Sequence, residues 1–166
     1  GDPLAKHFGY RRSAHKGPMP HGEVFSFYRA NLERRYGKNA VAKWGDVTVD
    51  RMLDWGFTSL GNWIDPAFYR KDRIPYFANG WIIGKFKTLS SGYWGAMPDP
   101  FDPAFVRRAK VTTKVVAEEV QGSPWCVGVF IDNEKSWGNV ASVKQHYAIV
   151  LDALARDAAE CPCKVA

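Results

Sequence analysis

One carboxylate, Glu134, stands at the end of an apolar stretch in VFIDNEKSWG, residues 129–138. Apolar surroundings disfavour the ionised form of a carboxylic acid. The apolar residues before Glu134 are therefore expected to form an apolar floor beneath its carboxyl group, which keeps the acid protonated near neutral pH. A protonated Glu134 can donate its proton to a leaving glycosidic oxygen, while Asn133 beside it hydrogen-bonds a ring hydroxyl. The structural alternative is that Glu134 caps the helix that follows or pairs with Lys135.

Two further apolar segments end in the same way, with a polar side chain followed by an aromatic one. These endings are Asn62-Trp63 and Asn79-Gly80-Trp81, and the third is 132–134 with Trp137 after it. Amides and carboxylates hydrogen-bond hydroxyl groups, and indoles stack on the apolar faces of sugar rings. We therefore expect the three endings to converge on one face. Asp132 is expected to orient or cap its strand end.

The elements that must position these residues follow from the apolar pattern. Residues 1–22 are rich in His, Arg, Gly and Pro and are predicted to form an irregular loop. Helices are predicted over residues 23–37, 39–55, 103–120 and 142–160, the third with Asp102 as its N-cap and Pro103 at its first position. Short strands are predicted at 57–63, 74–77 and 125–134, and a long loop at 84–100.

The predicted helices alternate with short, nearly continuous apolar strands. This order is typical of an α/β fold in which helices cover parallel strands. The chemistry of such folds is found at the carboxyl ends of the strands. The strand that precedes Glu134 is expected to be buried, with Cys126 as a small apolar residue inside it.

Composition narrows the classes of partner. The net charge is +6 and the pI is about 9.3, but the basic residues are dispersed and no nucleic-acid-binding signature is present, so no nucleic-acid partner is predicted. Cys161 and Cys163 lack the further ligands of a metal site, and three cysteines cannot all pair within one chain, so no metal is predicted. No apolar run reaches the length of a membrane-spanning helix.

Five segments carry a family resemblance: DPLAKHFGYRRSAHKGP, WGFTSLGNW, IPYF, PDPFDPAF and GVFIDNEKSWG. Together they resemble the family-50 glycoside hydrolases, the β-agarases, through nearly the whole chain. The resemblance implies a retaining (β/α)8 TIM-barrel glycosidase in which Glu134 is the acid/base and Asn133 is the neighbouring amide. It implies agarose or agaro-oligosaccharide as the substrate, hydrolysis of β-1,4 bonds, no cofactor, and a secreted or periplasmic location.

A complete barrel takes about 250 residues, and this chain has 166. We therefore predict that residues 1–166 are a partial glycosidase catalytic domain that carries about the second to fourth strands. Gly1-Asp2-Pro3 resembles the interior of a longer chain. The resemblance places the nucleophile on a later strand, so the partner carboxylate and the remainder of the parent chain are expected outside these residues. The isolated chain is then predicted to be inactive.

Two other functions stay open at this point. A non-catalytic carbohydrate-binding module could keep Asn62, Trp63, Trp94 and Trp137 as binding residues without turnover. The chain could also belong to another retaining barrel glycosidase of the clan that includes family 50. Such an enzyme would keep Glu134 as the acid/base but act on a different substrate. His15, in the basic RRSAHKGP segment, is predicted to donate to sugar hydroxyls, and Trp94 to stack on a sugar from the Gly/Ser-rich loop; the alternative for His15 is a solvated loop.

Overall fold

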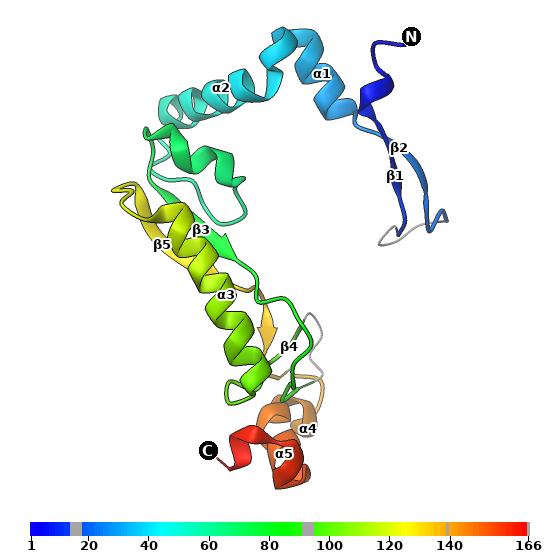
Figure 1. Cartoon of the computed structure of the whole chain (residues 1–166), viewed down its shortest axis with the longest axis vertical. Coiled ribbons are helices and arrows are strands. Elements are labelled where there is room, and N and C mark those ends of the chain that lie inside the picture. The colour runs from blue at the N-terminus through cyan, green and yellow to red at the C-terminus, as the bar shows by residue number, and fades with distance from the viewer. Residues whose placement is uncertain (14–17, 91–94, 139, 166) are drawn as a thin grey trace. The chain divides into compact units, whose positions relative to one another are not determined.

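The computed structural model describes residues 1–13, 18–90, 95–138 and 140–165. They form two compact units, Gly1–Thr58 and Ser59–Ala166 (Figure 1). None of the helices in these ranges is both long enough and apolar enough to cross a membrane.

A β-hairpin opens the first unit, where an irregular loop had been predicted. After a 3-10 turn at Ala5–His7, strand β1 (Phe8–Arg11) pairs antiparallel with β2 (Gly22–Phe25). Phe8 lies opposite Phe25, with their ring centroids 4.8 Å apart. Cross-strand aromatic pairs stabilise such ribbons. The prediction was wrong because the pairing depends on partners more than ten residues apart, which a glycine-rich composition conceals.

Two helices complete the first unit. Helix α1 (Phe27–Tyr36) ends at Gly37, whose φ of 73° is left-handed, as the sequence predicts for a glycine at a helix end. The helix begins later than predicted, because residues 23–25 belong to β2. A 3-10 turn at Gly37–Asn39 leads into α2 (Ala40–Asp54), which confirms the helix predicted over 39–55.

The second unit contains a parallel strand pair. Strand β3 (Tyr76–Gly80) lies beside β5 (Cys126–Ile131), and Leu60 adds a single parallel bridge to Tyr76. The parallel arrangement is confirmed. The strand predicted at 57–63 is only this bridge, and the strand predicted at 74–77 lies further along the chain at β3. Before it, Asp65 caps a 3-10 helix at Pro66–Lys71.

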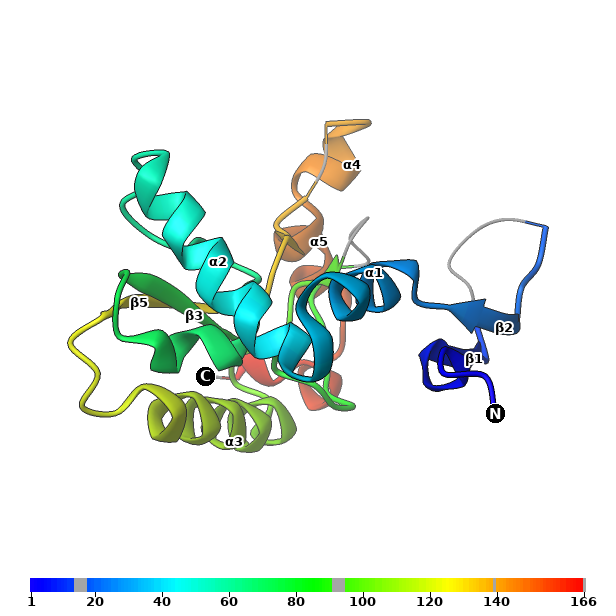
Figure 2. The ribbon, with the colours of Figure 1, turned by 90° about the horizontal axis from the view of Figure 1, so that it is seen from above.

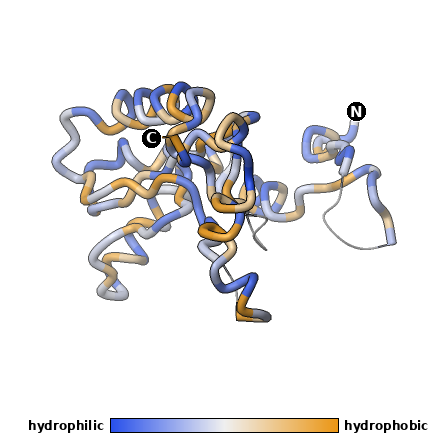
Figure 3. Tube along the Cα trace, turned by 90° about the horizontal axis from the view of Figure 1, so that it is seen from below, coloured by the Kyte–Doolittle hydropathy of each residue, from blue (hydrophilic) through white to orange (hydrophobic). Residues whose placement is uncertain are grey.

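Helix α3 (Pro103–Val120) covers one face of this pair (Figures 1 and 2). It begins as predicted: Asp102 accepts a hydrogen bond from the backbone N–H of Ala104, and Pro103 holds the first helical position. Hydrophobic and hydrophilic residues alternate around its turns (Figure 3), as expected of a helix with one buried face. The buried face includes Val116.

Close packing of α3 on β3 requires glycine at position 80. A Cβ atom added to Gly80 would lie 2.7 Å from Cγ2 of Val116 and 2.9 Å from Cγ2 of Thr112. Thr112 also donates a hydrogen bond to the carbonyl oxygen of Trp81, with a length of 2.8 Å. The helix therefore sets the position of the chain where β3 ends.

The last third of the chain is more broken than predicted. Strands β4 (Gly95–Ala96) and β6 (Lys135–Ser136) form a short parallel pair. The single helix predicted over 142–160 is instead α4 (Val143–His146), α5 (Ala148–Ala155) and 3-10 turns at Ala158–Glu160 and Pro162–Lys164. Tyr147, with φ −104° and ψ 29°, separates the two helices, and a helical pattern of apolar residues does not reveal such a break.

Strand β5 is not buried as the sequence predicts. Val127, Val129, Phe130 and Ile131 are all exposed, and Cys126 is half-buried. In the described part of the chain β3 is the only strand paired with β5, so the other edge and much of one face have no covering element. Exposed apolar surface of this extent is typical of an interface.

Candidate functional site

The carboxyl ends of β3 and β5 are joined by backbone and side-chain hydrogen bonds. The N–H of Asp132 donates to the carbonyl oxygen of Gly80 over 2.8 Å, and the N–H of Ile82 donates to Oδ1 of Asp132, also over 2.8 Å. These two bonds hold the residues after one strand against those after the other. Residues 79–81 and 132–134 therefore meet at one edge of the sheet, as predicted.

The third strand ending joins the same edge through an aromatic contact. The rings of Trp63 and Trp81 lie 4.9 Å apart, inclined by 42°, and the bridge from Leu60 to Tyr76 aligns residues 62–63 with the end of β3. Asn62 accepts a hydrogen bond from the N–H of Trp63 at 2.9 Å, so its carbonyl oxygen serves the local turn. The predicted convergence of the three endings is confirmed by these contacts.

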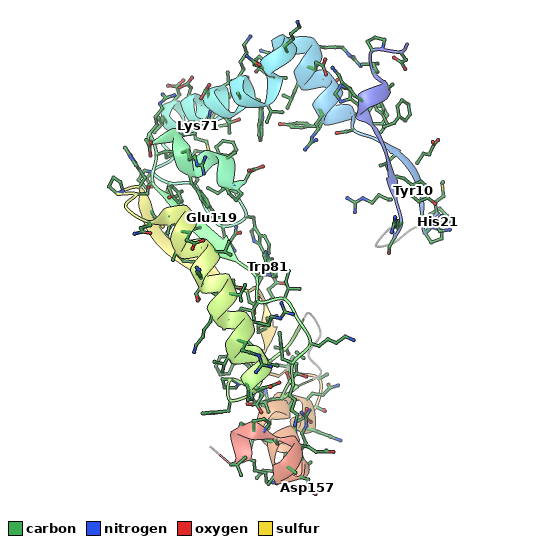
Figure 4. All side chains as sticks on the ribbon, in the orientation of Figure 1. Tyr10, His21, Lys71, Trp81, Glu119 and Asp157 are labelled. Atoms are coloured by element: carbon green, nitrogen blue, oxygen red, sulfur yellow. The ribbon has the colours of Figure 1, made fainter. Side chains whose placement is uncertain are left out.

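Trp81 closes the second predicted ending but was not among the predicted binding residues. It is 42% exposed and lies beyond the end of β3 (Figure 4). Its contact with Trp63, which is 56% exposed, makes a two-ring surface. The signal that could have found it is the repeated pattern of an amide followed by an indole.

Backbone strain is concentrated at this edge. Among the described residues other than glycine, four have positive φ: Trp63 (74°), Asp132 (58°), Glu134 (48°) and Asp72 (51°). Only Asp72 lies elsewhere, at the end of a 3-10 helix. Such conformations cost on the order of 1–3 kcal/mol each and gather at functional sites. Because a left-handed tryptophan is a marked outlier, this strain distinguishes the edge from ordinary loops.

Glu134 is exposed and Asn133 is half-buried. The apolar floor predicted beneath Glu134 is not formed by the described residues, since Val129 and Ile131 of β5 are 44% and 38% exposed. The prediction failed here because it needs elements on both sides of β5. The roles predicted for Glu134 and Asn133 stay predictions.

Asp132 orients the strand end, in line with its predicted structural role. Its side chain is only 7% exposed, and Oδ2 lies 3.5 Å from Nζ of Lys135. Oδ1 thus accepts a hydrogen bond from Ile82, which follows β3, while Oδ2 faces the ammonium group of Lys135. Glu134 lies between these two anchored residues.

Three predicted binding residues remain: Trp137, Trp94 and His15. Trp137 is 76% exposed and follows β6, whose carbonyl at Ser136 accepts a hydrogen bond from Ser90 at 2.9 Å. The exposed indole leaves the predicted stacking role of Trp137 a prediction. His15 and Trp94 lie outside the described residues.

The first unit contains a cavity that the sequence did not indicate. It has a volume of about 1,020 Å³ and lies between the hairpin, α1 and the start of α2. Glu33 at its wall accepts from Lys6 at 2.5 Å and contacts Nε2 of His7 at 2.8 Å. The hydrogen bond from Lys6, aided by that to His7, lowers the pKa of Glu33 against the opposing effect of desolvation. At the hairpin tip, Tyr10 pairs with His21 (Figure 4).

One cluster of donor atoms has metal-ligand types. An oxygen of Asp99 and the sulfur atoms of Cys161 and Cys163 all lie within 4.8 Å of one another. The sequence predicted no metal site because it showed only the two cysteines; the fold brings Asp99 to them from more than sixty residues away.

Two curated proteins are closely similar to this chain in amino-acid sequence. No family model matches the chain. Beta-agarase B of Vibrio sp. (strain JT0107) is 49% identical over 171 residues, which cover 99% of this chain and 18% of the relative. Beta-agarase A of the same strain is 45% identical over 136 residues, covering 78% of this chain and 14% of that relative.

Three solved structures resemble this chain in fold as well as in sequence. The structure of PfGH50B has a TM-score of 0.89 at 63% identity and is matched over 99% of this chain and 24% of its own. An exo-beta-agarase has a TM-score of 0.88 at 59% identity, over 98% of this chain and 23% of its own. The agarase AgWH50C has a TM-score of 0.86 at 56% identity, over 99% and 24%.

The chain thus spans less than a fifth of the length of these curated relatives and about a quarter of the solved chains. The match runs through both compact units and includes the strained edge with Asp132, Asn133 and Glu134. By sequence and by fold, the chain is homologous to one portion of the β-agarases of glycoside hydrolase family 50.

Proposed function

We propose that residues 1–166 are part of the catalytic domain of a β-agarase, which hydrolyses the β-1,4-galactosidic bonds of agarose or agaro-oligosaccharides with retention of configuration. The observation that carries this proposal is the match of 98–99% of the chain to agarases of known structure, together with a glutamate directly beyond a parallel strand. Glu134 is the acid/base and Asn133 binds the neighbouring sugar hydroxyl.

The strand arrangement supports a place in a larger barrel. The segment β3–α3–β5 is a parallel strand pair joined by a covering helix, which is the repeating unit of a (β/α)8 TIM barrel. The exposed edge and apolar residues of β5 suit a further strand. In such a barrel the carboxyl ends of the strands form the catalytic face, where Glu134 lies.

The chemistry needs two carboxyl groups about 5–5.5 Å apart. In the first step Glu134 donates a proton to the glycosidic oxygen while the second carboxylate attacks the anomeric carbon; the glycosidic bond breaks, one sugar leaves, and a covalent glycosyl-enzyme intermediate forms. In the second step the Glu134 carboxylate takes a proton from water, whose oxygen attacks the anomeric carbon and displaces the second carboxylate, which releases the other sugar. Glu118, at the far end of α3, is 63% exposed and pairs with Lys114 instead, so we assign the nucleophile to the remainder of the parent chain.

The substrate is bound by the residues around this edge. Trp63 and Trp81 offer adjoining ring faces, and Asn62 holds the turn that carries Trp63. We propose Trp137 as a further stacking residue beside Glu134, and keep Trp94 and His15 as proposed substrate contacts. A secreted or periplasmic location suits an enzyme that acts on a polysaccharide.

The decisive experiment is Glu134→Gln in the full-length enzyme. Hydrolysis of agaro-oligosaccharides should fall by about 10²–10⁴-fold, the usual contribution of general acid–base catalysis. An aryl glycoside whose leaving group needs no proton should lose far less activity in the glycosylation step. Glu118→Gln is the matched control and should leave both rates unchanged.

Three results would contradict the proposal. Equal losses on both substrates would show that Glu134 is not the proton donor. Retention of oligosaccharides by the wild-type enzyme, with no release of reducing sugar, would instead identify a carbohydrate-binding module. Release of sugar from another galactan, but not from agarose, would indicate a different glycosidase of the same clan.

A further inference from the structure

We propose that Cys161 and Cys163 form an intrachain disulfide that closes the C-terminal turn over Asp99. The two sulfur atoms lie 3.1 Å apart in the thiol form. Cys161 is fully buried, and Cys163 is half-buried. Only Pro162 separates them: Cys161 precedes a 3-10 turn and Cys163 lies within it, and the short distance between the sulfur atoms shows that the two side chains face each other.

The surroundings of Asp99 favour a disulfide over a metal ion. Its carboxylate is fully buried, and Oδ1 accepts from the N–H of Phe101 at 3.0 Å while Oδ2 accepts from the N–H of Cys163 at 3.1 Å. Oδ1 therefore holds the local turn at residues 99–101, and Oδ2 joins this turn to the cysteine turn. The carboxylate acts as a backbone clamp between residues 99–101 and the cysteine turn.

The spacing of the sulfur atoms points the same way. Two thiolates on a tetrahedral zinc ion, each at about 2.3 Å, stand about 3.8 Å apart. The sulfur atoms here are closer than that, and the described residues supply only three donor groups to the cluster. Bond formation requires the sulfur atoms to approach to about 2.05 Å, a movement of about 1 Å that small side-chain rotations can supply.

The oxidation is a two-electron step with an external disulfide as oxidant. The thiolate of the more accessible Cys163 attacks one sulfur of the oxidant and displaces the other half as a thiolate. Cys163 and the remaining half of the oxidant then form a mixed disulfide. The sulfur of Cys161 then attacks that of Cys163, releases the second thiolate of the oxidant and closes the ring. Two thiol protons and two electrons leave the protein, and the external disulfide becomes two thiols.

The first attack is slow at neutral pH. The hydrogen bond with the Cys161 thiol, burial and the nearby Asp99 carboxylate raise the pKa of Cys163 to about 11. The thiolate fraction at pH 7 is then about one in 10⁴, and it rises about tenfold with each pH unit below that pKa. Ring closure by the oxidant should accelerate in the same proportion, and the disulfide once formed is sheltered by the burial of Cys161.

Both cysteines fall in one tryptic peptide, Asp157–Lys164, which makes the test direct. The full-length enzyme is incubated at pH 9 with oxidised glutathione, denatured in acid, alkylated without reductant and digested. We expect this peptide to carry no alkyl group and to weigh two hydrogens less than its dithiol form. After reduction it should take two alkyl groups. The peptide Val115–Lys135, with Cys126 alone, is the internal control and should yield no internally bridged form.

Variants separate the possible outcomes. In Cys163→Ser the same peptide should take one alkyl group or one glutathione, because no ring can close. Two alkyl groups, or stable glutathione adducts on both cysteines, in the wild-type peptide would overturn the proposal. Zinc released in equal amount to the enzyme when these thiols are alkylated would also overturn it and identify a metal site.

Discussion

Asp132 is the residue that joins the two strands at the candidate site. It accepts the N–H of Ile82 across the sheet edge and lies 3.5 Å from the ammonium group of Lys135. Glu134 stands between Asp132 and Lys135 with a left-handed backbone. The backbone that carries Glu134 therefore lies between two residues that are held by side-chain contacts.

We expect Asp132→Ala to lower kcat by at least about tenfold in the full-length enzyme, with a smaller change in KM. A misplaced Glu134 would weaken stabilisation of the transition state more than binding of the ground-state substrate. Asp132→Asn keeps an oxygen acceptor for the N–H of Ile82 and should recover most of the activity. If the alanine and asparagine variants lose kcat equally, the hydrogen bond is not what positions Glu134.

Trp63 and Trp137 allow a test of the binding surface. Ring stacking contributes about 1 kcal/mol beyond burial, so either Trp→Ala substitution should weaken oligosaccharide binding about fivefold. Binding is measured by calorimetry in the Glu134→Gln background, where no hydrolysis interferes. Trp55→Ala, which removes a 71% exposed indole after α2, is the control. Unchanged affinity in both test variants would exclude a stacking role.

At the scale of elements, the contact between α3 and β3 controls where the site edge lies. Gly80 permits the approach of Val116 and Thr112, and Thr112 bonds to the carbonyl of Trp81. The N-cap carboxylate of Asp102 fixes the other end of the helix by accepting the backbone N–H groups of Lys87 and Ala104, which lower its pKa. The helix is thus anchored at the loop and packed against the strand.

Gly80→Ala should lower the free energy of unfolding by about 1–3 kcal/mol, since it forces a methyl group into a packed contact. Gly61→Ala is the matched control, because a Cβ atom there meets nothing within 4 Å. The two unfolding midpoints in urea are compared with that of the wild-type enzyme. Equal midpoints for the two variants would show that α3 can move away from β3 without cost.

At the scale of the whole molecule, the exposed residues of β5 and the proposed position of the nucleophile outside these residues have one common explanation. Both follow if the chain is one portion of a barrel whose other strands cover β5 and supply the second carboxylate. The apolar side chains of β5 would then form the floor predicted beneath Glu134. The chain's share of its relatives, less than a fifth, agrees with this reading.

The 166-residue chain expressed alone should hydrolyse agarose negligibly. Proton donation alone contributes about 10²–10⁴-fold, whereas glycosidic hydrolysis by enzymes commonly needs at least about 10⁶-fold. Reducing-sugar release is measured beside the full-length enzyme at equal molar concentration, with circular dichroism as the check on folding. Robust release that Glu134→Gln abolishes would place a nucleophile within these residues.

The sequence by itself determined the local features of this protein. Asp102 and Pro103 start α3, Gly37 ends α1, and the strands predicted at 74–77 and 125–134 overlap β3 and β5, because capping and strand propensity depend on near neighbours. The polar-then-aromatic endings also predicted which residues would meet. The family resemblance added the roles of Glu134 and Asn133.

Only the tertiary structure decided what depends on distant partners. The hairpin at 8–25 forms through Phe8 and Phe25, the last helix breaks at Tyr147, and Asp99 reaches the cysteine turn across more than sixty residues. The exposure of β5 and Glu134 likewise follows from which elements lie beside them, not from their own side chains. Burial and pairing are properties of neighbours in space, and a sequence pattern records only neighbours along the chain.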